Sequence, residues 1–199
     1  IDKHYGRWLE AWAELTEINP TGAKMSTAGT VTDGTLFQNM SSMGGVTDDA
    51  AALVFIPLQF WFNRNPGLAL PLIALQYHEV KVSITWGNVT SMDNTKLYAD
   101  YIYLDTDERR RFAQVSHEYL IEQVQSQSFT GGATMDLTFN HPVKELVWTG
   151  AVSAGVTLAA LTANKTWQLK LNGHDRMAAR DVKYYTRAQI HAHHTGFGG

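Results

Sequence analysis

The residues with the most obvious chemical potential are histidines near the carboxyl end of the chain. His191, His193 and His194 lie in the run HAHHTGFGG. Imidazole binds zinc, but a zinc site needs three or four ligands that converge in space. His191 and His193 would share one face of a strand. Because the chain has no cysteine and no H-E-x-x-H motif, we predict a polar loop after a strand here, and no metal site.

Acidic and basic residues also gather at 105–111, in the sequence DTDERRR. Asp105, Asp107 and Glu108 could resemble the paired carboxylates of a glycosidase, and the run Arg109 to Arg111 could contact phosphate. We interpret the group differently. Asp105 with Glu108 three residues later is typical of a helix N-cap, and the arginines suit the end of a short helical turn. The charges are therefore expected to form a solvated or interface salt-bridge cluster.

Composition and motifs exclude several classes of function. With 16 basic and 19 acidic side chains, the net charge of −3 gives no general attraction to nucleic acid or to anionic membranes. Phosphate-loop, G-x-S-x-G and G-x-G-x-x-G motifs are absent from the sequence, and no apolar run approaches the roughly 20 residues of a membrane helix. We predict no catalytic residue, no cofactor and no transmembrane segment. Three glycosylation triplets of the form N-x-S/T begin at Asn39, Asn88 and Asn164, so attachment of glycans is left open.

The elements that would position these residues centre on 53–86. Apolar side chains alternate from Val54 to Phe62 and again from Val80 to Trp86, which predicts two strands with one buried face each. Pro66-Gly67 and Pro71 interrupt the segment between them. We expect residues 68–75 to form an extended crossing, packed against the core.

Before this stretch, residues 3–16 are expected to be helical. Tyr5, Trp8, Trp12 and Leu15 recur every three or four residues, so they should form an aromatic stripe that pins the helix across a sheet or barrel end. Asp2 is a possible N-cap, and Asn19-Pro20 would end the element. Residues 20–52 look loop-rich, with a short hairpin over 30–39 around Asp33-Gly34.

After residue 95 the pattern is again one of short strands. The stretch 96–104 is apolar on both sides, which predicts burial on both. Further strand signals are HEYLIEQVQ, ATMDLTF and VKELVWT, followed by a loop at 150–164, an alternating stretch at 167–171, a turn at Asn172-Gly173 and a last strand over 182–190. Many short strands with little helix indicate an all-β protein, a sandwich or a jelly roll.

Four long segments resemble one known family. They are PLQFWFNRNPGLALPLIALQYHEVKV, YIYLDTDERRRFAQVSHEYLIEQVQ, NHPVKELVW and LKLNGHDR, and they are similar to the major capsid proteins of nucleocytoplasmic large DNA viruses, of the phycodnavirus and iridovirus type. The resemblance implies a double jelly roll. It places the C-terminal part of the first jelly roll at 1–105, a linker at 106–118 and the N-terminal part of the second jelly roll at 119–199.

The same resemblance implies a structural role and no enzyme activity. Family members form homotrimers, pseudo-hexagonal capsomers that contact neighbouring capsomers and minor capsid proteins and build an icosahedral shell, without direct contact to nucleic acid. The expected location is the virion capsid, assembled in the infected host cell, in its cytoplasm. His78 and His117 lie in matched segments and should satisfy local hydrogen bonds. The matched residues Phe60, Trp61, Arg64, Pro66, Pro71 and Asp105 are expected to serve the fold.

Two other hypotheses about function stay open. A carbohydrate-binding (lectin-like) jelly roll predicts exposed, coplanar aromatic rings, whereas the capsid reading predicts that Trp8, Trp61, Trp86 and Trp148 are mostly buried. A cupin-like metal enzyme would need convergent histidines on barrel strands, a spacing that the sequence lacks. Family members are roughly twice as long as this chain, so we expect a partial sequence whose unpaired strand edges make residues 1–199 alone fold poorly.

Overall fold

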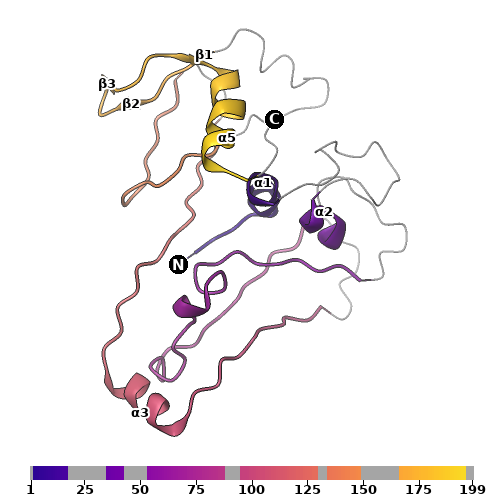
Figure 1. Cartoon of the computed structure of the whole chain (residues 1–199), viewed down its shortest axis with the longest axis vertical. Helices are drawn as coiled ribbons and strands as arrows, with labels where there is room; N and C mark the ends of the chain where they lie inside the picture. Colours follow the sequence, from indigo (N-terminus) through magenta and orange to yellow (C-terminus); the bar gives the residue numbers. More distant parts are fainter. Residues whose placement is uncertain are drawn as a thin grey trace. The chain divides into compact units, whose positions relative to one another are not determined.

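The computed structural model describes residues 2–17, 35–42, 53–87, 95–129, 134–148 and 166–195. The chain divides into two compact units, Ile1–Gln59 with Val124–Gly199, and Phe60–Gln123. Figure 1 labels their elements along the sequence colours. The first unit holds α1 (Gly6–Thr16), α2 (Leu36–Ser41), β1 (Thr166–Trp167), β2 (Lys170–Leu171), β3 (His174–Asp175), β4 (Arg180–Asp181), η2 (Tyr184–Gln189) and α5 (Ile190–His193). The second unit holds η1 (Pro66–Leu68) and α3 (Thr106–Gln114).

The predicted N-terminal helix is confirmed as α1, with a different start and a different buried face. Its N-cap is Tyr5, not Asp2, and the side chain of Tyr5 makes no capping bond. The helix ends at Thr16, ahead of Asn19-Pro20, which lies outside the described residues. Leu9 and Ala13 are buried with Phe37 of α2, and Trp8 packs beside them. The partner of α1 in this core is therefore a second helix, and the buried stripe is rotated from the predicted aromatic one.

Residues 36–41 are helical, which corrects the hairpin expected over 30–39. Thr35 caps α2, because its side chain accepts a bond from the Gln38 amide at 3.1 Å while the Gln38 side chain accepts from the Thr35 amide at 2.9 Å. This reciprocal capping box satisfies two backbone donors of a short helix. The signature T-x-x-Q was present in the sequence and could have been recognised. The rest of the expected hairpin, 30–34, lies outside the described residues.

The turn at Asn172-Gly173 is confirmed. Both residues have positive φ, 52° and 76°, and they connect β2 to β3 in an antiparallel pair in which Leu171 faces His174. Positive φ at both central residues is the geometry that a two-residue hairpin prefers, and Asn-Gly adopts it at low cost. A second antiparallel pair joins β1 to β4, with Trp167 opposite Arg180.

The strand predicted over 182–190 is wrong, because the chain is helical there. Tyr184–Gln189 form the π-helical turn η2, and Ile190–His193 continue as α5. The Asp181 carboxylate accepts a bond from the Lys183 amide at 2.8 Å, which satisfies a free backbone donor where the helix begins. Figure 1 shows this helix following the hairpin of β1 to β4 at the yellow end of the chain.

The structure does not confirm an all-β double jelly roll. In the described residues, the paired strands are four segments of two residues each, in two separate sheets. The described parts of the stretches predicted as strands, at 54–62, 80–86, 96–104, 117–125, 133–139 and 143–149, carry no strand pairing. The loop expected at 150–164 lies outside the described residues.

The chain after Arg64 forms turns, whereas residues 68–75 were expected to be an extended crossing. Asn65 caps η1, its side chain accepting a bond from the Gly67 amide at 2.9 Å, with Pro66 in the first turn. Pro71 then accepts bonds from the amides of Ala74 and Leu75. Proline fixes φ near its helical value and lacks a donor, so it suits the first position of each turn.

Helix α3 follows the predicted cap. Asp105 Oδ1 accepts a bond from the Glu108 amide at 2.8 Å, so the N-cap prediction is confirmed. The helix runs on to Gln114, and only Arg111 lies in its last turn. No helix in the described part of the chain is long and apolar enough to span a bilayer.

Candidate functional site

The C-terminal histidines lie on or just after a helix and do not converge. His191 and His193 belong to α5, so they do not share a strand face as predicted. His194 contacts the Glu145 carboxylate at 2.6 Å and packs edge-on against Trp12, with ring centroids 6.4 Å apart. Within the described ranges, no group of three His, Asp or Glu side chains could hold a metal ion. The contacts of His194 connect the residue after α5 to two other segments of the first unit, at Trp12 and Glu145.

The charged group at 105–111 forms a capped helix with an ion pair between Arg110 and Asp107. Arg110 lies 3.3 Å from Asp107, and both side chains are largely exposed. Asp105 uses its carboxylate on the Glu108 amide, so one of the three acids is committed to the backbone. Exposed pairs of this kind contribute little to stability. The arrangement supports the interpretation as a cap with solvated charges.

The second unit contains a shallow apolar hollow of about 620 Å³ between its connector and the end of α3. Trp61, Leu70, Pro71, Val115 and Tyr119 are among the residues that line it. The rings of Trp61 and Tyr119 lie 6.0 Å apart at 51°. The Tyr119 hydroxyl donates to the Ala69 carbonyl at 3.4 Å. These contacts tie the chain before α3 to the chain after it.

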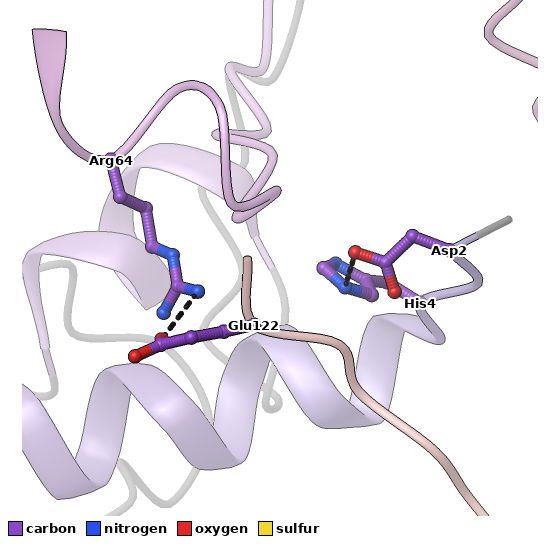
Figure 2. Close-up of polar contacts among 4 residues, drawn as sticks. All are labelled: Asp2, His4, Arg64 and Glu122. Atoms are coloured by element: carbon purple, nitrogen blue, oxygen red, sulfur yellow. Dashed lines mark hydrogen bonds and ion pairs between the residues drawn. The ribbon is translucent and has the colours of Figure 1, made fainter. Parts of the chain in front are cut away.

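Two polar contacts support the same part of the second unit. Arg64 lies 3.0 Å from the Glu122 carboxylate (Figure 2). The His117 ring bonds to the Phe112 carbonyl at 2.7 Å, which confirms the local hydrogen bond predicted for His117. Figure 2 also shows the His4 and Asp2 side chains, of the first unit, 3.3 Å apart. The matched residues Trp61, Arg64 and Pro71 therefore make packing and pairing contacts.

The tryptophan prediction holds only in part. Trp8 and Trp61 are half-buried, but Trp86 and Trp148 are 39% and 46% exposed, so their predicted burial is wrong for this structure. Trp148 packs with Trp167 and Tyr185 at interplanar angles of 48° and 70°. These tilted rings do not make the coplanar platform that a lectin-like module requires.

Much apolar surface is exposed in the stretches that were predicted as strands. Val80, Val82 and Ile84 are exposed along one alternating series. In 96–104, Tyr98 and Tyr103 are exposed on opposite sides of the segment, so the predicted burial of both faces is wrong here. Exposed apolar area of this extent marks surfaces that associate with another element or chain.

The triplet at Asn39 is built into a helix. Asn39 lies in α2, and the Ser41 hydroxyl donates to the Phe37 carbonyl at 2.6 Å and is buried. A glycan needs a surface site, so this triplet is poorly presented. The triplets at Asn88 and Asn164 begin outside the described residues.

The carboxyl of Glu14, on α1, has a pKa displaced from its ordinary value. Burial raises the pKa of this carboxyl, the Glu10 charge raises it further, and the hydrogen bond from Gln38 opposes both. No nucleophile lies beside Glu14 in the contacts of α1 and α2. Capping, packing and exposed apolar surface are typical of one class, the structural proteins.

Comparison with known proteins gives the family within that class. Residues 1–105 match the profile "Major capsid protein N-terminus", and residues 108–197 match "Large eukaryotic DNA virus major capsid protein". The chain is 47% identical to the major capsid protein of Pyramimonas orientalis virus, covering 98% of this chain and 50% of the relative. It is 34% identical to that of Paramecium bursaria Chlorella virus 1, covering 95% and 54%, and 38% identical to that of Phaeocystis pouchetii virus, covering 82% and 40%.

The chain belongs to the major capsid protein family of large eukaryotic DNA viruses. The relatives that it matches are named for a structural role, as major capsid proteins. It spans about half the length of the curated relatives that it matches. No solved structure matches it significantly.

Proposed function

We propose that this chain is the central part of a capsid subunit with two successive jelly rolls. Residues 1–105 complete the first, residues 106–118 link the two, and residues 119–199 begin the second. Three such subunits form a capsomer with six similar barrels, and these pseudo-hexagonal capsomers tile an icosahedral shell. A closed ring of three requires a head-to-tail interface between subunits.

The observation that carries the proposal is the order of the two family matches. One ends at residue 105 and the other begins at residue 108. Asp105, the last residue of the first match, caps α3, which continues into the second match, and α3 occupies most of the proposed linker. Because α3 is a capped helix, most of the linker has a defined conformation. This suits a linker that holds two barrels in one subunit.

The exposed apolar series also supports unfinished barrels. Val80, Val82 and Ile84 are exposed in the second series, and 53–56 are exposed without alternation at the start of the first. The period of two in the second series fits a strand whose partners supply the opposite layer. The buried indole N–H of Trp167 finds no acceptor within the described residues, and a buried donor of this kind costs about 1–3 kcal/mol unless it is paired. Neighbouring strands would remove both costs.

A shell built of such trimers requires contacts between each trimer and other capsid components. Neighbouring capsomers and minor capsid proteins are the proposed partners, reached through loops and through the linker. Glycans are compatible with Asn88 and Asn164, which lie in predicted loops, and less so with Asn39 for the reasons above. Nucleic acid is not a proposed partner, because the net charge is −3.

The test is the solution mass of the protein produced from its complete reading frame, measured by light scattering behind size exclusion. The proposal predicts a mass of three chains that persists on dilution. A monomer across the same concentrations would contradict it. A monomer that also binds glycans would favour the lectin-like alternative, and binding to an array of soluble oligosaccharides is the matched control.

A further inference from the structure

Helix α3 has an order of charges that is complementary to itself. Its amino-terminal half carries Asp107 and Glu108, and three arginines follow at 109–111. In the reverse direction the order of acid and base is exchanged. A second copy of α3 that ran antiparallel to the first would therefore place its arginines beside the acidic residues of the first, and opposite charges placed in this way select a partner and its orientation.

One side of α3 presents both signs of charge to solvent. Arg110 and Arg111 follow Asp107 by three and four residues, and Gln114 follows Arg110 by four, so these four side chains lie along one side of the helix. We call them the outer face of α3. The side chain of Asp107 is 90% exposed and that of Arg110 is 64% exposed. Phe112, which is half-buried, lies on the opposite side.

The outer face is not covered by the described part of the chain. No residue of α3 is buried, and no helix or strand within the described ranges packs closely on it. Figure 1 shows α3 where the chain turns between the extended segments before and after it.

The charges on the outer face are only partly matched within the helix. Arg110 lies 3.3 Å from Oδ1 of Asp107, and Arg111 forms no ion pair with any described residue. A carboxylate has two oxygens that accept bonds. The Asp107 carboxylate can therefore pair with an arginine of a second chain and keep its contact with Arg110.

The antiparallel direction determines the symmetry of such a contact. Copies of one helix that pack side by side about a three-fold axis run parallel, so that acid meets acid and base meets base. A two-fold axis perpendicular to the helices makes them antiparallel, and the contact is then isologous. Since the proposed ring of three subunits is head-to-tail, a contact through α3 would join chains of different trimers.

We propose that the outer face of α3 binds the same face of a second copy of this chain, antiparallel about a two-fold axis; the assignment of the two copies to neighbouring trimers rests on the proposed function. Asp107 of each copy meets Arg110 and Arg111 of the other. One exposed ion pair contributes little, but each trimer offers three copies of α3, so weak contacts act together across a shell. Because the pairs are exposed, salt weakens them.

The test uses the protein produced from its complete reading frame, with its mass measured by analytical ultracentrifugation at about 0.05 M and at about 0.5 M salt, where screening differs strongly. Wild-type trimers should associate further at low salt and separate at high salt. Asp107→Lys makes the charges of the outer face all basic, and Arg110→Glu with Arg111→Glu makes them all acidic. Each variant alone should associate at least about tenfold more weakly at low salt, because like charges then meet. An equimolar mixture of the two variants should restore association.

Glu108→Lys is the matched control. It reverses one charge in the same helix, on the side of Phe112, which lies four residues further on, so it should associate as the wild type does. The neutral variants Asp107→Asn and Arg111→Gln provide a second test that places no charge of the wrong sign in the helix dipole. Each should weaken association at low salt by about threefold.

Four results would overturn the proposal: no association of the wild type at low salt, no restoration in the mixture, the same loss in Glu108→Lys as in Asp107→Lys, or unchanged association in both neutral variants. A wild-type chain that is monomeric at high salt would contradict the proposed trimer alone. The contact through α3 would then appear at low salt as a dimer, with the same response to the variants.

Discussion

Replacing Asp105 by alanine should loosen α3 measurably. The Asp105 carboxylate accepts a bond from the Glu108 amide at 2.8 Å, and its backbone carbonyl accepts from the Arg109 amide at 2.9 Å. Alanine keeps the carbonyl bond and removes the side-chain one. The helix has nine residues, a length that is marginal without caps and packing.

The expected cost is about 1 kcal/mol, the usual loss when an Asp N-cap becomes alanine. Because exchange of helical amides follows the free energy of local opening, 1 kcal/mol corresponds to about fivefold faster exchange in α3. Asp105→Asn keeps an acceptor oxygen and loses only the charge at the helix N-terminus, worth about 0.3–1 kcal/mol. It should therefore exchange more slowly than Asp105→Ala.

Hydrogen exchange read out over 106–115 provides the assay. Asp107→Asn is the matched control, because it removes a charge from the same helix and breaks only the exposed pair with Arg110. The reasoning is refuted if Asp105→Ala leaves exchange unchanged, or if Asp107→Asn accelerates it as much. Either result would mean that packing outside the cap holds α3.

Three further outcomes follow from the structure. Phe37→Ala should lower the free energy of unfolding of the first unit by about 3 kcal/mol, because Phe37 is 2% exposed. Chemical denaturation measures this, and a loss below about 1 kcal/mol would mean that Phe37 is not part of the core. Gly173→Ala should cost about 1–2 kcal/mol, since φ is 76°; faster exchange confined to β2 and β3 is the expected readout. Residues 1–199 produced alone should aggregate, and a soluble monomer with a cooperative melting transition would contradict that expectation.

Signals that act over a few residues could be read from the sequence. The cap at Asp105 and the turn at Asn172-Gly173 depend on bonds within four residues, and both were predicted correctly. The capping box of Thr35 and Gln38 and the side-chain bond of Asp181 were also present as local signals. They were missed because the surrounding composition indicated loops or a strand.

Partners distant in sequence could not be read in the same way. A period of two in 80–86 predicts which face of a strand is apolar, but it contains no information on which segment supplies the other hydrogen bonds. The buried face of α1 shows the same limit. Its aromatic residues suggested one stripe, and the position of Phe37 selected another, centred on Leu9 and Ala13.

The candidate site was predicted mainly through resemblance. Trp61, Arg64 and Pro71 were selected from matched segments. The structure places Trp61 and Pro71 in the lining of one hollow and pairs Arg64 with Glu122. Glu14 was not selected, because a glutamate on a helix surface carries no motif. Its environment depends on Gln38, which is 24 positions away in the sequence.

The most direct test of the central claim is a density map, at residue resolution, of the particle formed by the protein from its complete reading frame. The account predicts three subunits per particle. In each subunit, 54–62 and 80–86 should be paired strands of one jelly roll, and 119–199 should contribute to a second, joined through α3. A subunit with a single barrel, or one in which 54–62 and 80–86 remain unpaired, would contradict it.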